Sequence, residues 1–366
     1  MLKLLPRYSA YVQFSSSRPA LVGIGAIILL ALAAAALLIV VKLPRPSLDQ
    51  AAASFNQNNF SAAITNINFV LLRDPRNVEA LLLRAEILAQ QGSITFNEQE
   101  YGQQAIAIAQ QVLSIDPTND EAYRVIGYAN EIMQQYNAAH AEYQKALSLN
   151  PHNALAIADD AHAYDLQGEL DKAKAGYEAS LALDPNTTLA HMGLGRILVA
   201  EGDLDGALAQ FQSVYRTSGN VRTRAEAAYS AGIISGMKGE SAATERSMRL
   251  ATTMDPTYPL AWAGLGAVLF ARSYATSSPL TADGRVGLVR ESMQDLVKAI
   301  NLNPNQSSAY LQLGVELAAL GQKTDAIRIL GDGKAVVMKD ITLGAAEKTA
   351  MSARIGALLT GVANRK

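Results

Sequence analysis

The sequence predicts an all-α fold in which helical hairpins repeat along the chain. Three observations support this prediction: Asp or Asn precedes Pro at regular intervals, Leu-Gly pairs recur between these breaks, and 49% of the residues are hydrophobic. The breaks are Asp74-Pro75, Asp116-Pro117, Asn150-Pro151, Asp184-Pro185, Asp255-Pro256 and Asn303-Pro304. Because proline interrupts a helix, we expect each pair to separate one hairpin from the next.

The breaks have a period of 34 residues in the middle of the chain. Pro117, Pro151 and Pro185 are each 34 residues apart, and one further step reaches Gly219, another helix breaker. The remaining intervals are 42, 37 and 48 residues, so they exceed the period by 8, 3 and 14. We therefore expect insertions near residues 92–102 and 272–287, between the two helices of the second and the seventh hairpin.

Large and small residues follow a fixed pattern within each period. First helices carry Trp262-x2-Leu265-Gly266-x2-Leu269, Tyr310-x2-Leu313-Gly314-x2-Leu317, Tyr123-x2-Ile126-Gly127 and His191-x2-Leu194-Gly195-x2-Leu198. Second helices carry Ala139-x3-Tyr143, Ala173-x3-Tyr177 and Ala207-x3-Phe211. This pattern resembles the tetratricopeptide repeat, and the resemblance covers residues 44–340 as eight repeats.

The resemblance implies a right-handed superhelical solenoid of about eight helical hairpins, with a concave groove lined by the first helices. It also implies binding of peptides or proteins, without naming a partner. Residues 342–366 are expected to form a capping helix and a C-terminal tail, because Met351, Ile355 and Leu358 recur at helical spacing opposite charged residues.

An uncharged apolar segment of 23 residues, residues 19–41, precedes the repeats. As a helix it would measure about 34 Å, which is enough to cross a hydrocarbon core of about 30 Å. A buried helix of a soluble protein and a cleaved signal peptide fit the length and the apolar run at 37–41 less well. We therefore expect an apolar helix that either anchors the chain in a membrane or lies between subunits.

The charges around this segment predict its orientation. Residues 1–18 form a short basic tail with Lys3, Arg7 and Arg18, whereas Lys42 and Arg45 follow the segment. This excess favours a single-pass protein with a cytoplasmic N-terminus and with the repeats in the periplasm or outside the cell.

The composition disfavours several classes of function. Cysteine is absent, which excludes disulfides and thiolate metal sites, and the net charge of −2 argues against nucleic-acid binding. Asp159, His162 and Asp165 have a spacing that three metal ligands could share, but solvated groove residues are the better interpretation. We expect no enzyme, no cofactor, no metal and no small-molecule substrate.

The predicted groove has an acidic part and an apolar part. In repeats two to four the inner positions that the resemblance implies include Glu79, Glu86, Glu121, Arg124, Glu131, His162 and Asp165. In repeats five to eight they include Leu189, Met192, Val199, Ile233, Met237, Leu260, Ala263, Phe270, Leu311, Val315 and Ala318. A ligand for this groove should be basic at one end and apolar along the rest. The alternative is a tightly wound superhelix whose inner face packs on itself.

Two hypotheses of function follow. The first is a non-catalytic, membrane-anchored scaffold that binds other proteins along the solenoid. The alternative is a structural subunit of a surface filament or large complex, in which residues 19–41 of one copy occupy the apolar groove of the next. Partners are therefore other proteins or copies of the same chain.

Overall fold

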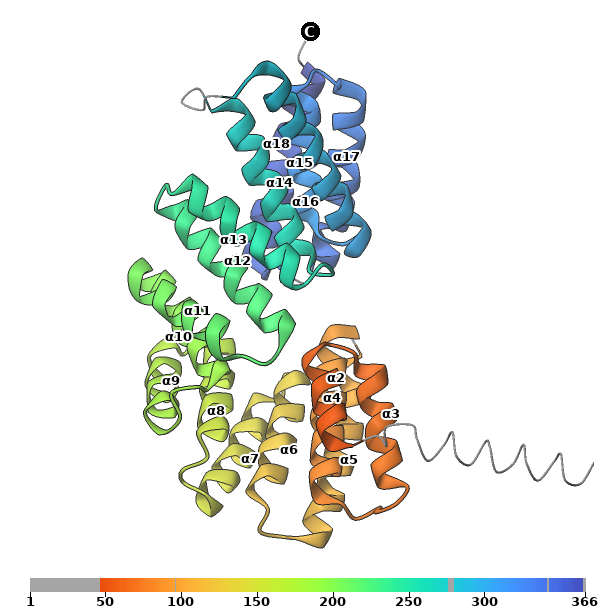
Figure 1. The fold of residues 1–366 in the computed structure, drawn as a ribbon, viewed down its shortest axis with the longest axis vertical. Helices are drawn as coiled ribbons and strands as arrows, with labels where there is room; N and C mark the ends of the chain where they lie inside the picture. Colours follow the sequence, from red (N-terminus) through yellow and green to blue (C-terminus); the bar gives the residue numbers. More distant parts are fainter. Residues whose placement is uncertain (1–46, 96, 276–279, 341, 365–366) are drawn as a thin grey trace, which may run out of the picture. The chain divides into compact units, whose positions relative to one another are not determined.

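The computed structural model describes residues 47–95, 97–275, 280–340 and 342–364 (Figure 1). The predicted basic tail (1–18) and apolar helix (19–41) lie outside the described residues. No helix within the described ranges combines the length and apolar character needed to span a bilayer.

The described residues form seventeen α-helices, one short 3-10 helix and no strand, which confirms the all-α prediction. The first helices of the hairpins are α2 (Leu48–Asn56), α4 (Val78–Thr95), α6 (Asp120–Ile132), α8 (Ala154–Leu166), α10 (Thr188–Glu201), α12 (Val221–Met237), α14 (Pro259–Tyr274) and α16 (Ser307–Ala319). The second helices are α3 (Phe60–Leu71), α5 (Glu98–Ile115), α7 (Tyr136–Leu149), α9 (Leu170–Leu183), α11 (Leu204–Thr217), α13 (Ser241–Met254), α15 (Ala282–Leu302) and α17 (Lys323–Val336). The 3-10 helix η1 (Val337–Lys339) and α18 (Ala345–Asn364) follow, and α18 packs against α17.

The breaks between hairpins are turns held by polar side chains. At the first 34-residue interval, the Asp116 carboxylate accepts a hydrogen bond from the Thr118 amide at 3.0 Å. Asn119 then caps α6, because its side-chain oxygen accepts from the Ala122 amide at 2.9 Å. Asn77, Asn153 and Asn220 cap α4, α8 and α12 in the same way. One turn therefore ends a hairpin and begins the next.

Close helix packing explains the Leu-Gly pairs. A Cβ atom at Gly127 would lie 2.5 Å from Cε1 of Tyr143, and one at Gly314 would lie 2.5 Å from Cγ of Leu330. Larger residues at these positions would push the second helix away. The glycine of the first helix and the large residue of the second therefore fit together within one hairpin.

The two insertions lengthen helices. In the second hairpin α4 and α5 have 18 residues each, and in the seventh α14 and α15 have 16 and 21, whereas α6 to α9 have 13 or 14. Both long hairpins therefore project beyond their neighbours at the end where their two helices meet.

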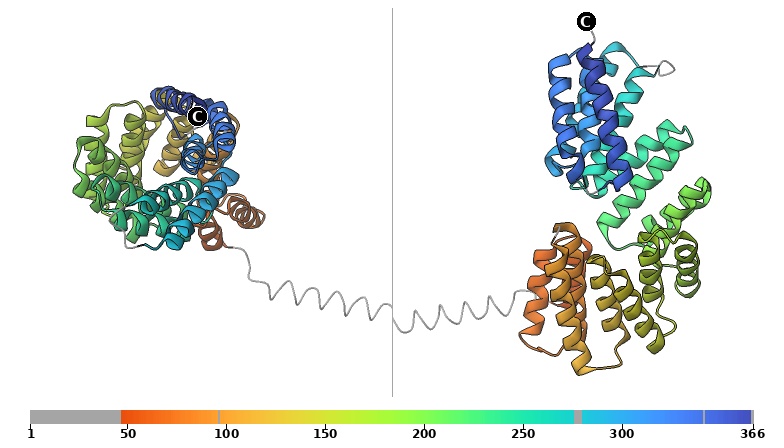
Figure 2. Two further views of the ribbon diagram at one scale, coloured as in Figure 1. Left: turned by 90° about the horizontal axis from the view of Figure 1, so that it is seen from above. Right: turned by 180° about the vertical axis from the view of Figure 1, so that it is seen from behind.

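The hairpins wind around a central space (Figure 2). The turn after α2 meets the turn before α12, where the Asn220 side-chain amide donates to Asn58 Oδ1 at 3.4 Å. Gly219 also lies against Asn56 at this point. The first and sixth repeats are thereby brought together, and the first helices between them surround a common inner surface.

Candidate functional site

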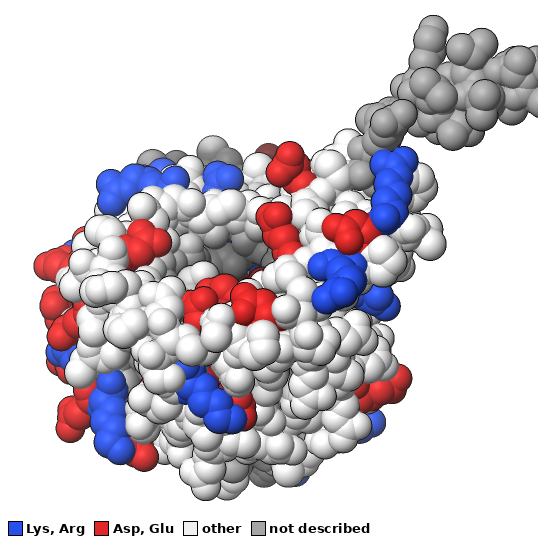
Figure 3. Space-filling model, turned by 90° about the horizontal axis from the view of Figure 1, so that it is seen from below, with Lys and Arg blue, Asp and Glu red and all other residues white. Residues whose placement is uncertain are grey.

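A pocket of about 620 Å³ lies on this inner surface. Side chains of α2, α4, α6, α8, α10 and α12 line it, so six successive first helices contribute to one site. Its lining includes Phe55, Glu86, Gln90, Arg124, Tyr128, Asp159, His162, Leu189, Met192, Arg196 and Glu226. Figure 3 shows the central opening from below, with acidic side chains at its rim.

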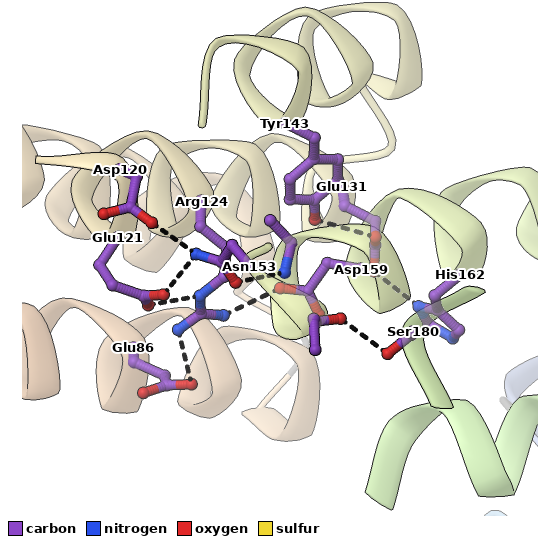
Figure 4. Close-up of polar contacts among 12 residues, drawn as sticks. Glu86, Asp120, Glu121, Arg124, Glu131, Tyr143, Asn153, Asp159, His162 and Ser180 are labelled. Carbon is purple, nitrogen blue, oxygen red and sulfur yellow. Dashed lines mark hydrogen bonds and ion pairs between the residues drawn. The ribbon is translucent and has the colours of Figure 1, made fainter. Parts of the chain in front are cut away.

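Arg124 is the buried centre of an ionic network (Figure 4). Only 6% of this residue is exposed. Its Nε lies 2.7 Å from Glu121 Oε2, its Nη1 lies 2.9 Å from Asp159 Oδ2, and its Nη2 lies 3.4 Å from Glu86 Oε1. One guanidinium therefore bridges α4, α6 and α8, and three carboxylates share one positive charge.

The network shifts the pKa values of its members. Burial acts to lower the pKa of Arg124, but the charges of Glu86, Asp159 and Glu121 outweigh it and raise that pKa well above its usual range. Burial raises the pKa of Asp159 to about 6, although Arg124 opposes the shift. The network thus keeps a negative surplus that a further cation would stabilise.

The other predicted acidic residues divide between internal contacts and the surface. Glu131 is buried, and its carboxylate accepts from the Tyr143 hydroxyl at 3.1 Å and contacts His162 Nδ1 at 2.8 Å. Asp165 accepts from Arg196 at 2.9 Å, while Glu79 is exposed on α4. Asp159, His162 and Asp165 thus contact three different side chains, Arg124, Glu131 and Arg196, rather than one common point.

The predicted apolar residues are divided between the pocket, the core and the surface. Leu189 and Met192 line the pocket. Leu311 is buried, whereas 57% of Met237 is exposed. Half-buried residues that pack against the cores of their own repeats are Val199, Leu260 and Val315. Ile233 is exposed, and the ring of Phe270 packs against Tyr274 with centroids 4.8 Å apart.

Two residues that depart from the repeat pattern are satisfied locally. Asp160, which replaces an apolar residue, accepts from Gln144 at 3.0 Å and contacts His140 Nδ1 at 2.5 Å. His191, which replaces the usual large aromatic, is buried and contacts Gln210 Oε1 at 2.6 Å. Both positions therefore have a structural explanation.

Sequence reasoning missed Glu226, which lines the pocket from α12. Burial raises the pKa of this carboxyl, although nearby Arg222 opposes the shift. One step of 34 residues from Met192 reaches Glu226, so the period itself could have identified it.

Family models confirm the repeats in the first part of the chain. Residues 48–120 and 159–221 match one model of the tetratricopeptide repeat, and residues 120–153 match a second. No curated protein sequence matches the chain. The chain therefore contains tetratricopeptide repeats, as the residue pattern predicted.

One solved structure supports this fold, and two others align more weakly. The Cut9–Hcn1 hetero-tetramer of APC/C aligns with a TM-score of 0.62 and 16% identity over 83% of this chain, which spans about half (54%) of that protein's length. A tetratricopeptide repeat protein from Parabacteroides merdae (17% identity, TM-score 0.48) aligns over 74% of this chain and 98% of its own. PilF of Pseudomonas aeruginosa (16% identity, TM-score 0.49) aligns over 65% and 98%. The first of these supports the fold alone.

Proposed function

We propose that this chain is a non-catalytic scaffold that holds a segment of another polypeptide in the inner pocket. Tetratricopeptide repeats generally mediate protein interactions, and solenoids use their concave faces for this purpose. The observation that carries the proposal is the pocket of about 620 Å³ built by six successive first helices. A site assembled from so many repeats suits an elongated ligand.

The chemistry of the pocket favours a basic residue next to an apolar one. The lining contains four carboxylates, those of Glu86, Asp159, Asp184 and Glu226, and two guanidinium groups, those of Arg124 and Arg196. Among the described residues, Glu226 forms no ion pair with a Lys or Arg, because the nearby Arg222 pairs with Asp255 and Arg196 with Asp165. Leu189 and Met192 provide the apolar contact. A ligand cation near Glu226 would stabilise the ionised carboxylate that burial disfavours.

The test uses the full chain and two labelled peptides, one with Lys after two Leu residues and one with Glu in place of Lys. We expect the Lys peptide to bind, and Glu226→Gln with Glu86→Gln to weaken it at least about tenfold in Kd. Glu178→Gln, on the exposed side of α9, is the matched control and should leave Kd unchanged. Equal binding of the two peptides, or an unaffected double variant, would refute the proposed site.

The proposal includes a membrane tether. Residues 19–41 are uncharged and long enough as a helix to cross a bilayer, and the excess of basic residues before them favours repeats on the outer side. We expect the chain to remain with membranes in alkaline carbonate, to keep Met1, and to lose the repeats to protease added outside. Release into the soluble fraction with a new N-terminus near Ala36 would exclude the tether and leave the scaffold proposal intact.

A further inference from the structure

A second, apolar groove of about 850 Å³ lies at the seventh repeat. It is formed by the end of α14, by one face of α15 and by the residue that ends α16. Its apolar lining consists of Tyr274, Val286, Val289, Met293, Val297 and Leu320. None of these residues lines the inner pocket.

The groove results from unequal helix lengths. α15 has 21 residues, whereas α16 and α17 of the next hairpin have 13 and 14. The difference of seven residues between α15 and α17 corresponds to about 10 Å of helix, or two turns. One side of α15, with Leu288 and Leu296, is buried in the core. On the adjacent side, Val286 and Val297 are 56% and 46% exposed.

We propose that this groove binds an amphipathic α-helix of another protein, one that carries an acidic residue beside its apolar stripe. Val286, Val289, Met293 and Val297 follow one another at intervals of three, four and four residues, so they form a straight stripe along α15. The stripe is about 16 Å long. A second helix with apolar side chains at the same intervals of three and four residues can pack along it. Val286 and Val297 of this stripe are exposed, and exposed apolar side chains gathered on one helix face mark an interaction surface.

The charge of the rim identifies the partner's polar side. Arg290 lies between Val289 and Met293, is exposed, and has no described carboxylate within ion-pair distance. The guanidinium of Arg285 donates to the carbonyls of Ser273 and Ala275 at 2.6 and 3.0 Å. The groove therefore has basic residues and no acidic one among its lining. An Asp or Glu on the bound helix would pair with Arg290.

The same charge argues against two other occupants. In an antiparallel pair of α15 helices from two copies, the central Arg290 side chains would approach each other, and like charges disfavour that contact. The apolar segment 19–41 is also unsuited, because residues 1–48 contain no Asp or Glu. A helix from a different protein is thus the occupant that the groove favours.

The experiment uses the full chain in lipid nanodiscs and two labelled, helix-forming peptides. Both peptides have Leu at alternating intervals of three and four residues; one has Glu beside these positions and the other has Lys. We expect the Glu peptide to bind more tightly, and Arg290→Glu to weaken it at least about tenfold in Kd while improving binding of the Lys peptide. Val286→Asp combined with Val297→Asp should abolish binding of both peptides.

Controls separate this groove from the rest of the chain. Gln99→Asp combined with Gln110→Asp places the same charges at the matching positions of α5 and should leave Kd unchanged. Glu226→Gln should also have no effect, so the two proposed sites fail independently. The proposal is overturned if both peptides bind equally or if the Val286 and Val297 substitutions leave binding intact. It is also overturned if these substitutions have no effect other than to separate associated copies of the chain, as measured by sedimentation. Circular dichroism confirms that each variant is folded.

Discussion

The second and seventh repeats are both lengthened, but only the seventh has an apolar groove. The second helices of these repeats, α5 and α15, end at Asp116 and Asn303. When the two helices are aligned at these residues, Gly102 of α5 corresponds to Val289 of α15. Met133, which ends α6, packs over Gly102, where a Cβ atom would lie 2.8 Å from its Cγ. Leu320 ends α16 at the position that matches Met133. Val289 occupies the space that Gly102 leaves open in the second repeat, and Leu320 remains 42% exposed.

The exposed faces of the two long helices also differ. Gln99, Gln103 and Gln110 stand at the positions that correspond to Val286, Arg290 and Val297, and all three are exposed. The projecting part of α5 is therefore covered by Met133 or hydrated, whereas that of α15 is apolar. An insertion in a repeat does not create a binding surface by its length; the residues on its free face decide this.

Repeats two to four and repeats seven and eight also differ in what their buried acidic groups contact. In repeats two to four Arg124 contacts three carboxylates. In repeats seven and eight Glu316 is fully buried and accepts only neutral hydrogen bonds among the described residues, from Ser292 at 2.7 Å and Gln312 at 3.2 Å. Burial raises the pKa of Glu316 to about 7. Repeats two to four pair the buried Asp159 with a cation, whereas repeats seven and eight keep a buried carboxyl that protonates readily.

The largest effect is expected at the ionic network. Arg124→Ala leaves Glu86, Glu121 and Asp159 without their shared cation, and we expect the free energy of unfolding to fall by about 3–5 kcal/mol at pH 8. Protonation of Asp159 should make the loss smaller at pH 5. Urea denaturation followed by circular dichroism measures both values.

The matched control is Arg328→Ala, which breaks ion pairs with Asp325 and Asp332 on the surface. Both partners are more than half exposed, so the change should be below about 1 kcal/mol. A loss at Arg124 no larger than this would show that the buried network does not hold repeats two to four together.

The second prediction concerns Glu316 and pH. Its pKa is about 7 in the folded chain, against an ordinary value of 4.5. Because the folded state binds this proton more tightly than the unfolded state, its contribution to stability falls as pH rises from 4.5 to 7, by at most about 3 kcal/mol. Glu316→Gln should therefore raise the melting temperature more at pH 8 than at pH 5. An equal change at both pH values would contradict the assignment.

The smallest effect tests the comparison of the long hairpins directly. Gly102→Val introduces the side chain that α15 has at this position, and contact with Met133 should cost about 1–3 kcal/mol of unfolding free energy. Gly102→Val together with Met133→Ala removes that contact and should recover part of the loss. If Gly102→Val alone is neutral in thermal denaturation, the packing of Met133 on Gly102 is not the reason that the second repeat lacks an apolar groove.

The sequence alone determined the hairpins. Asp116 and Asn119 specify one turn through hydrogen bonds to residues two and three positions away, and Gly127 receives Tyr143 of the same hairpin. These interactions are local, so they leave a periodic pattern that can be recognised without a structure. The tetratricopeptide repeats, the Pro-containing breaks and the all-α class follow from that pattern.

Only the tertiary structure decided which inner residues meet. The sequence indicated Glu86, Glu121 and Arg124 as groove residues. The contact of Arg124 with both Glu86 and Asp159 depends on how α4, α6 and α8 are rotated relative to one another. Leu311, which the sequence also indicated as a groove residue, is instead buried in the core formed by the last repeats. A repeat pattern gives the position of a residue within its hairpin. The angle between successive hairpins results from side-chain packing between them, and small changes in that angle move a residue from a groove into a core.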